Sequence, residues 1–229
     1  VGEDYDFEAL LGNHVMQGTQ DVTSVLTRAG RVFGMESGHY RDEGALARIG
    51  EWARAARAAR MARRLRVGVL GAPFADMGDF GADPTRLLVD WGPHILPIPV
   101  GRFIEILGRV ADAEADRIVE SDRSRYDADP GVTREMHRRS ARLEIALRQL
   151  VEEYGLGAFS MNFLDLVADG RCPTLPFLGI NKLMAEGLGY AGEGDALTAA
   201  FMAQLRQLAG AATFAEMYTA DYAARRIVM

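Results

Sequence analysis

The sequence predicts an α/β protein with a Rossmann-like parallel sheet that is flanked by helices in three layers. Amphipathic helical patterns alternate along the chain with short apolar runs, and this alternation implies a parallel sheet covered on both faces. A second observation is the polar segment 72–84, which is rich in Gly, Pro and Asp and directly follows an apolar run. Alternating α/β folds usually keep their binding groups in such loops.

The first part of the chain predicts a helix, a strand and a second helix in that order. Apolar residues at helical spacing predict a helix over residues 19–30, and residues 31–35 have the pattern of a short strand. Asp42 is a good N-cap for a long amphipathic helix over residues 43–64. Because a new strand starts after this helix, a domain boundary is expected near Arg64. The predicted inward face of the long helix consists of Ala45, Ile49, Trp52 and Ala56.

The second part of the chain carries the strands of the predicted sheet. Residues 65–71 and 157–163 have buried-strand patterns, and residues 95–100 form an extended run whose two prolines exclude it from a helix interior. The predicted helices cover residues 85–92, 100–122, 134–155, 179–189 and 196–210.

Two of these helices have a well-defined apolar stripe. The stripe of the helix over 134–155 consists of Leu143, Leu147, Leu150, Val151 and Tyr154, and Gly155 ends the helix. The last helix has Asp195 as its expected N-cap and stops at Gly210. Its predicted inward face consists of Leu197, Phe201, Leu205 and Leu208.

The composition of the chain limits the classes of molecule that it is expected to bind. The net charge of −6 and the sequence pI near 5.3 argue against a dedicated nucleic-acid or anionic-membrane binder, so a small or neutral ligand fits better. Cys172 is the only cysteine, which excludes an intrachain disulfide and favours a cytoplasmic setting. The chain shows no membrane span and no secretion signal, and it begins with Val1 rather than Met.

Basic residues are almost all arginine. Lys182 is the only lysine among 26 basic residues, so no other position can form a lysine Schiff base. Residues 54–66 hold one basic cluster, for which a phosphate or nucleic-acid role is conceivable, but a solvated helix face interleaved with alanines is the favoured interpretation. The cluster consists of Arg54, Arg57, Arg60, Arg63, Arg64 and Arg66.

Glu193 stands between two glycines, Gly192 and Gly194, directly before the last predicted helix. Asp195 already serves as the N-cap, so Glu193 is free for another role, and glycines on both sides allow a close approach to a ligand. The nearby helix N-terminus favours the ionised carboxylate. Taken alone, the G-E-G-D turn is most simply a solvated acidic turn, and neither G-x-G-x-x-G nor a P-loop motif is present.

Four segments of the chain carry a resemblance to a known family, namely residues 37–54, 157–166, 189–200 and 213–222. In the same order and at similar spacing, they resemble the L-arabinose isomerase and L-fucose isomerase superfamily, with the arabinose isomerase branch most similar. The resemblance implies an aldose-ketose isomerase that uses a divalent metal, typically manganese, bound by two glutamates and two histidines. It assigns Glu193 as one metal ligand and as a catalytic carboxylate, because moving a proton between C1 and C2 requires a base.

The resemblance also implies residues that line the sugar pocket. Phe163 matches an aromatic beside the substrate, with core packing at a strand end as the alternative, and Met77 matches a loop position, with a methionine tucked under the sheet as the alternative. Gln17 stands where arabinose isomerases carry a histidine, and it can hydrogen-bond a sugar but cannot take up a proton near neutral pH. His14 could replace that histidine or be a surface residue, and His39 could serve the site or a local cap.

The resemblance further implies the domain organisation. Residues 1–64 match the C-terminal part of the family's first domain, a partial α/β domain, and residues 65–229 match its central domain. The second metal-binding glutamate and both histidines are expected beyond Met229, so the chain is expected to be either a fragment with an incomplete, inactive site or a shortened relative. The complete protein is expected to be a homo-oligomer. The competing hypothesis is a noncatalytic sugar-binding or assembly module with the same fold.

Overall fold

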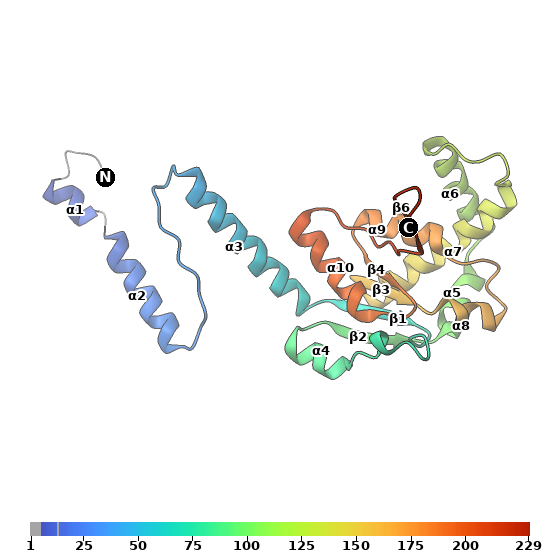
Figure 1. Ribbon diagram of the computed structural model, residues 1–229, viewed down its shortest axis with the longest axis horizontal. Coiled ribbons are helices and arrows are strands. Elements are labelled where there is room, and N and C mark those ends of the chain that lie inside the picture. The colour runs from blue at the N-terminus through green and yellow to red at the C-terminus, as the bar shows by residue number, and fades with distance from the viewer. Residues whose placement is uncertain (1–5, 13) are drawn as a thin grey trace. The chain divides into compact units, whose positions relative to one another are not determined.

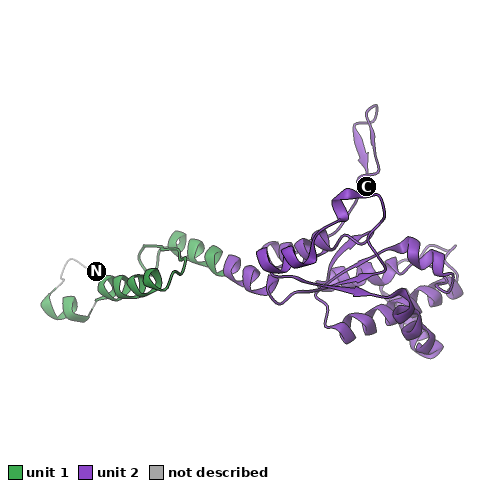
Figure 2. Ribbon diagram, turned by 90° about the horizontal axis from the view of Figure 1, so that it is seen from below, with its two compact units in different colours: residues 1–53 green, residues 54–229 purple. Residues whose placement is uncertain are grey.

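The computed structural model (Figure 1) describes residues 6–12 and 14–229 of the chain. The chain divides into two compact units, residues 1–53 and 54–229 (Figure 2). The division falls within the long helix α3 (Glu43–Ala62), whereas the boundary predicted from the sequence lies just after that helix.

The first unit contains α1 (Phe7–Gly12), α2 (Val15–Arg28) and the beginning of α3. The strand predicted over residues 31–35 is wrong, because these residues have no regular secondary structure. The described part of this unit has no strand that could pair with the segment, and the side chain of Val32 is fully exposed. The segment is attached to α3 instead, since Glu36 accepts hydrogen bonds from Arg48 and Trp52.

Helix α3 begins as predicted but does not bury the predicted face. Asp42 caps it by accepting hydrogen bonds from the backbone N–H groups of residues 44 and 45, at 2.9 and 3.3 Å. Of the predicted inward residues only Ala45 is buried, while Ile49 and Trp52 are 50% and 56% exposed. The stripe remains exposed because the described first unit offers few elements to cover it. In the second unit the same helix buries Ala58 and Ala62.

The second unit is built on a parallel sheet, as predicted. The strand order is β2-β1-β3-β4, and all neighbouring pairs are parallel. Strand β4 was not expected, since half of its residues are glycine. A Cβ at Gly189 would lie 2.4 Å from the backbone oxygen of Ala199, so the glycine allows the following helix to lie directly on the strand. The strands are β1 (Arg66–Leu70), β2 (His94–Ile98), β3 (Ala158–Met161) and β4 (Gly189–Gly192).

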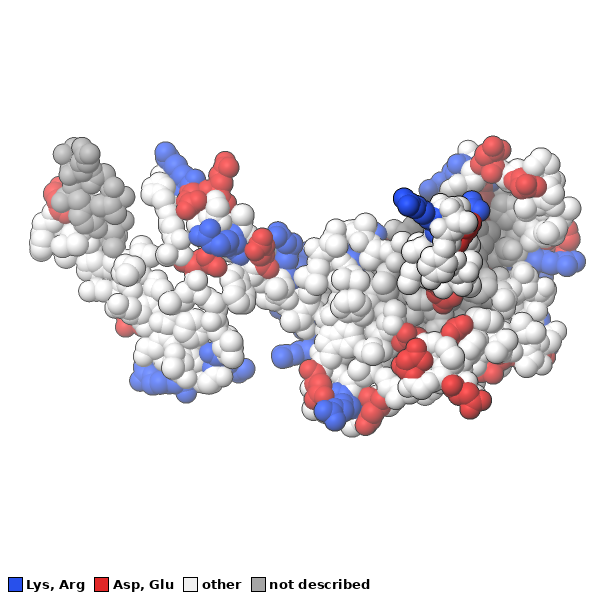
Figure 3. Space-filling model, viewed as in Figure 1, with Lys and Arg blue, Asp and Glu red and all other residues white. Residues whose placement is uncertain are grey.

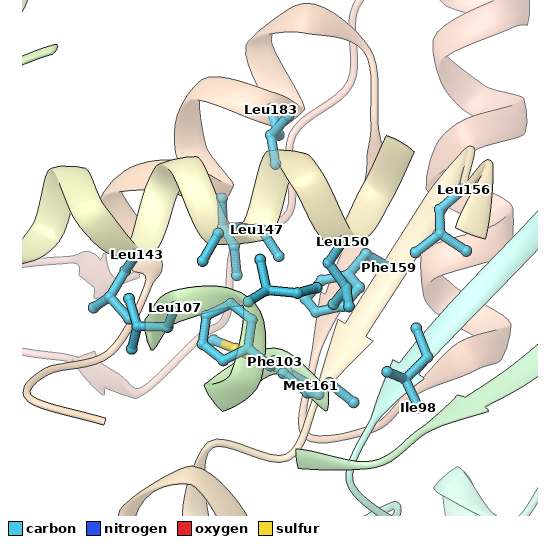
Figure 4. Packing of buried hydrophobic residues seen from close by; sticks show 14 of the residues in the cluster. Ile98, Phe103, Leu107, Leu143, Leu147, Leu150, Leu156, Phe159, Met161 and Leu183 are labelled. Atoms are coloured by element: carbon cyan, nitrogen blue, oxygen red, sulfur yellow. The ribbon is translucent and has the colours of Figure 1, made fainter. Parts of the chain in front are cut away.

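Helices cover both faces of this sheet. On one face α5 and α7 pack against the strands, and Phe103, Leu147, Leu150 and Phe159 form the centre of the main core (Figure 4). On the other face α10 packs against β1, β3 and β4, and α4 contacts β2. The elements are η1 (Gly78–Phe80), α4 (Pro84–Asp90), α5 (Val100–Arg109), α6 (Asp112–Arg125), α7 (Arg134–Tyr154), α8 (Phe163–Asp169), α9 (Phe177–Glu186) and α10 (Ala196–Ala209).

Helix α10 does not bury the predicted face, of which only Leu205 is half-buried. Leu197, Phe201 and Leu208 are 41%, 50% and 45% exposed, whereas Ala199 and Ala200 are fully buried. The physical reason is the short distance between the helix and the glycine-containing strand β4, which only small side chains can fill. Its N-cap is as predicted, because Asp195 accepts a hydrogen bond from the backbone N–H of residue 198.

Two further features were missed. The strand predicted over 157–163 ends at Met161, and Asn162 caps α8 by accepting hydrogen bonds from two backbone N–H groups. Near the C-terminus, β5 (Thr219–Asp221) and β6 (Arg226–Val228) form an antiparallel hairpin. Within the described residues, no helix combines the length and apolar character that crossing a membrane requires.

Candidate functional site

The candidate site lies at the carboxyl ends of β1, β3 and β4. The connection that leaves β1 leads to β2 on one side, and the connection that leaves the neighbouring strand β3 leads to β4 on the other side, so the strand order reverses between β1 and β3. In open parallel sheets, ligands bind outside the carboxyl ends of the strands where the strand order reverses. The loop after β1, residues 71–83, the start of α8 and the turn at 193–195 all lie at this edge.

The backbone of Glu193 is held in an unusual conformation. Its φ of +65° lies in the left-handed region, which costs a non-glycine residue about 1 kcal/mol or more. The backbone oxygen of Glu193 accepts a hydrogen bond from the N–H of Phe74 at 2.9 Å, which joins the turn to the loop after β1. Gly194 has φ +89°, and a Cβ there would lie 2.4 Å from Cα of Pro73. The sequence G-E-G-D is therefore required by the close approach of two loops, and it fixes the direction in which Glu193 leaves the backbone.

Two other carboxylates influence Glu193. Burial raises the pKa of Glu193 above its usual value, and the negative charges of Glu216 and Asp79 raise it further. Within the described residues, no cation forms an ion pair with any of these three carboxylates. In Figure 3, acidic side chains gather on the surface over the loop after β1. The site is an acidic cluster without a neutralising partner.

Glu216 is a functional candidate that the sequence reasoning missed. One of its oxygens lies 3.4 Å from the position that a Cβ on Gly192 would occupy, so the carboxylate lies at the carboxyl end of β4. The sequence reasoning expected the second metal-binding glutamate beyond Met229. A signal was available, because Glu216 is the only charged residue in the segment 207–220. The structure thus places a second glutamate, Glu216, beside the predicted site residue Glu193.

Tyr190 lies beside these carboxylates within β4. Its hydroxyl is buried and has no hydrogen-bond partner in the described part of the chain. Burial raises the pKa of Tyr190, and the charges of Glu216 and Glu193 add to this effect. The phenol therefore stays protonated and keeps a hydrogen available for donation.

The donor set fits a hard divalent ion only in part. Carboxylate oxygens suit manganese or magnesium, and Glu193 and Glu216 could supply two of them. Among residues 6–12 and 14–229, however, no group of three or more His, Cys, Asp or Glu side chains is arranged to hold a metal ion. These residues could supply part of a metal site, while a complete donor set is absent from the described chain.

The two pocket residues predicted in the second unit lie at the same edge of the sheet. Phe163 is the first residue of α8, where its ring packs 5.0 Å from that of Phe74 and 6.2 Å from that of Phe177. It also contacts the main core, so it combines a packing role with a position next to the loop that binds the Glu193 backbone. Met77 lies in the loop after β1 and is 42% exposed, so it is not tucked beneath the sheet.

The remaining predicted residues belong to the first unit. His14 occupies the N-cap position of α2 without a capping side-chain hydrogen bond, and both His14 and Gln17 are exposed. His39 accepts a hydrogen bond from the backbone N–H of Arg41 at 3.2 Å, which is the local role expected as one alternative. A role for these three residues in the site of Glu193 stays a prediction.

A second acidic cluster lies among α6, α7 and α9. The side chains of Asp122 and Glu144 are 7% and 2% exposed, and the amino group of Lys182 lies 2.6 Å from one and 2.5 Å from the other. His137 is hydrogen-bonded to Asp122 at 2.9 Å. Burial alone would raise the pKa of Asp122, but its hydrogen bonds to Lys182 and His137 lower it below the usual value. The only lysine of the chain thus neutralises an internal pair of carboxylates.

The fold and the candidate site together define an α/β protein of Rossmann-like architecture with a cluster of carboxylates at the reversal point of its parallel sheet. Comparison with known proteins identifies the family within this class. Residues 83–211, more than half of the chain, match the model of the L-arabinose isomerase central domain, and the chain belongs to the L-arabinose isomerase family.

Individual relatives agree with this assignment. The chain is 32% identical over 225 residues to an L-arabinose isomerase from Nocardioides sp., a match that covers 94% of this chain and 44% of the relative. It is 30% identical over 191 residues to the L-arabinose isomerase of Erwinia tasmaniensis, covering 81% of this chain and 38% of the relative. The enzyme of the same name from Clavibacter sepedonicus is 32% identical over 225 residues. The chain therefore spans less than half the length of these relatives.

Proposed function

We propose that this chain forms part of a metal-dependent aldose-ketose isomerase of the L-arabinose isomerase type. The observation that carries the proposal is the pair of glutamates, Glu193 and Glu216, which lie at the carboxyl ends of the strands without a neutralising partner among the described residues. Family membership supplies the substrate class, because the relatives are named L-arabinose isomerases. A small sugar is also compatible with the net charge of −6.

In the proposed reaction Glu193 moves a proton between C1 and C2 of the sugar. Without a cation, burial and the charges of Glu216 and Asp79 raise the pKa of Glu193, and a bound divalent cation would offset this effect and favour the ionised carboxylate that accepts the proton. A bound divalent ion, with manganese as the proposed species, would polarise the sugar oxygens. Glu216 holds negative charge beside Glu193, and Phe163 and Met77 offer apolar surface at the same edge.

The rest of the proposed active site comes from outside the described residues of this chain. The donor set is partial, and the chain spans 44% of the length of the Nocardioides relative. We therefore propose that a complete site needs additional segments and a homo-oligomer, and that this chain alone is inactive. Gln17, in place of a family histidine, would hydrogen-bond the sugar without exchanging protons. The single cysteine is consistent with a cytoplasmic protein.

The test is an isomerase assay with L-arabinose on the longest protein that contains this sequence, supplied with manganese. The variant Glu193→Gln removes the base and keeps the shape, so kcat should fall by about 10² to 10⁴. Glu152→Gln, which removes an exposed carboxylate on α7, should leave kcat unchanged. A Glu193→Gln enzyme within about threefold of the parent kcat would contradict the role of this residue.

A noncatalytic sugar-binding or assembly module is the second candidate. The observation that favours it is the incomplete donor set among the described residues. This alternative predicts that L-arabinose binds the 229-residue chain with the same affinity in the presence of chelator and in Glu193→Gln. Calorimetric titration distinguishes the two, because a metal-dependent site loses sugar affinity under both conditions.

A further inference from the structure

Four arginines line a concave pocket at the amino ends of the strands. The pocket has a volume of about 490 Å³ and is lined by Arg57, Arg60, Arg64 and Arg66, with no acidic residue among its walls. We call it the arginine pocket. In the described chain none of these four arginines forms an ion pair, although most other guanidinium groups of the second unit do. A chain with a net charge of −6 therefore concentrates unpaired positive charge in one depression.

The arginine pocket is separate from the carboxylate site. Arg66 is the first residue of β1, and Gly157 directly precedes β3, so the pocket lies at the amino ends of the strands. Glu193 follows the last residue of β4, at the carboxyl ends. A strand of five residues such as β1 spans about 16 Å at about 3.3 Å per residue, which separates the two sites.

Helix ends do not neutralise the pocket. The helices α3 and α7 both end beside it, at Ala62 and Tyr154, and Arg66 donates a hydrogen bond to the backbone oxygen of Tyr154 at 2.7 Å. Each helix C-terminus carries the equivalent of about half a negative charge, so two of them offset about one of the four positive charges. Arg66 serves this structural role, which leaves Arg57, Arg60 and Arg64 for an external anion.

The walls of the pocket also limit the ligand. Met61, Leu65 and Leu156 supply apolar surface between the guanidinium groups. The volume is that of a small-molecule site, and guanidinium forks match phosphate oxygens in geometry. A bound nucleic acid would need a basic surface much longer than this depression, on a protein whose overall charge is negative.

We propose that the arginine pocket binds a small ligand with a diphosphate group, and that it does so independently of the carboxylate site. Two linked phosphates provide enough negative charge and acceptor oxygens for three guanidinium groups. The diphosphate can be free or belong to a nucleotide whose ring occupies the apolar surface.

The test is calorimetric titration of the full 229-residue chain with sodium pyrophosphate, in the presence of chelator and at constant ionic strength. We expect one pyrophosphate to bind per chain. When the titration is repeated at a higher fixed salt concentration, the affinity should be lower. The triple variant Arg57→Gln, Arg60→Gln and Arg64→Gln should lower the affinity at least about tenfold. Titration with ADP under the same conditions shows whether a nucleotide binds more tightly than the free diphosphate.

A control variant that removes the same number of positive charges distinguishes binding in the arginine pocket from general electrostatic attraction of pyrophosphate to the chain. The triple variant Arg28→Gln, Arg31→Gln and Arg117→Gln removes three exposed arginines that form no ion pair in the described chain. It should keep the pyrophosphate affinity within about twofold, and so should Glu193→Gln. The proposal is overturned if the parent chain shows no binding, if the control loses as much affinity as the pocket variant, or if short RNA binds through the same arginines more tightly than pyrophosphate.

Discussion

Two acidic clusters of this chain differ in how their charge is compensated. Among α6, α7 and α9, the carboxylates of Asp122 and Glu144 are almost completely buried, and Lys182 lies within hydrogen-bond distance of both. At the carboxyl ends of the strands, the charge of Glu216 raises the pKa of Glu193, and neither carboxylate forms an ion pair with any described residue. The first cluster is complete within the chain. The second resembles a half-site that needs a cation from solution.

The pKa shifts of the two clusters have opposite signs. In the internal cluster, hydrogen bonds from Lys182 and His137 outweigh burial and lower the pKa of Asp122. At the sheet edge, burial and the neighbouring charges of Glu216 and Asp79 all raise the pKa of Glu193. A neutralised carboxylate therefore contributes to folding stability, whereas an uncompensated one decreases it until a ligand binds.

The largest expected effect comes from removing the cation of the internal cluster. Lys182→Met removes the cation that Asp122 and Glu144 share, so that Asp122 keeps only His137 and Glu144 keeps only Arg148 as a side-chain partner. Because both carboxylates are buried, the free energy of unfolding should decrease by about 3 kcal/mol. Urea denaturation at pH 7 measures this change. Arg117→Met, at an exposed position of α6, is the control and should change stability by less than about 0.5 kcal/mol. A loss below about 1 kcal/mol in Lys182→Met would show that water already compensates the two carboxylates.

The second-largest expected effect is the stabilisation of the chain by manganese bound at Glu193 and Glu216. Manganese added at about 100 times its dissociation constant should stabilise the chain by about 2.7 kcal/mol if it binds only the folded state. The double variant Glu193→Gln and Glu216→Gln should lose this stabilisation, because both proposed oxygen ligands are neutral. Thermal unfolding with and without manganese measures the effect, and Glu152→Gln should respond like the parent. Equal stabilisation of parent and double variant would place the ion elsewhere.

The sequence predicts the parallel sheet and its longest helix because those elements repeat a simple pattern. After Arg66, strand β1 is a continuous run of buried residues, and α7 buries Leu143, Leu147 and Leu150 as its spacing indicates. The spacing in α10 indicates the wrong face, because burial there depends on distance to the sheet. Gly189 brings the helix so close that Ala199 and its neighbour fit and larger residues do not.

The site could be predicted only as far as local sequence determines it. The turn that carries Glu193 is predictable, since the glycines around it and the cap that follows it are all within a few residues, whereas the role of Glu193 stays a prediction. Glu216 reaches the same edge because the chain reverses after α10, where Gly210 has φ +80°. The approach of Pro73 to Gly194 likewise joins segments far apart in the sequence. The apolar pattern and the residue spacing within one segment do not predict contacts between segments that are far apart in the sequence.

A third effect tests the internal cluster by pH. Because the folded-state pKa of Asp122 is lowered, its contribution to stability is present at neutral pH and is lost as the pH falls through that lowered value. The expected loss is about 2 kcal/mol, the size of hydrogen bonds to a charged group. In Asp122→Asn this contribution is absent, so the stability difference between parent and variant should decrease below about pH 4. If the difference in unfolding free energy between the parent and Asp122→Asn stayed constant from pH 6 to pH 3, this explanation would be wrong.

The smallest effect concerns the isolated charge of Glu193. Its folded-state pKa is raised, so the folded state holds the proton more tightly, and stability falls as the pH rises from the usual glutamate value through the raised one. Glu193→Gln keeps the shape and removes the charge, so without metal its Tm at pH 7 should exceed that of the parent by about 1 to 2 °C. At pH 4 the two proteins should have nearly equal Tm values, because both side chains are then largely neutral. Glu152→Gln, with an exposed carboxylate, should show no such pH-dependent difference. If Glu193→Gln were less stable than the parent at pH 7 in chelator, the carboxylate would have a stabilising partner in the chain, and the contrast between the two clusters would be wrong.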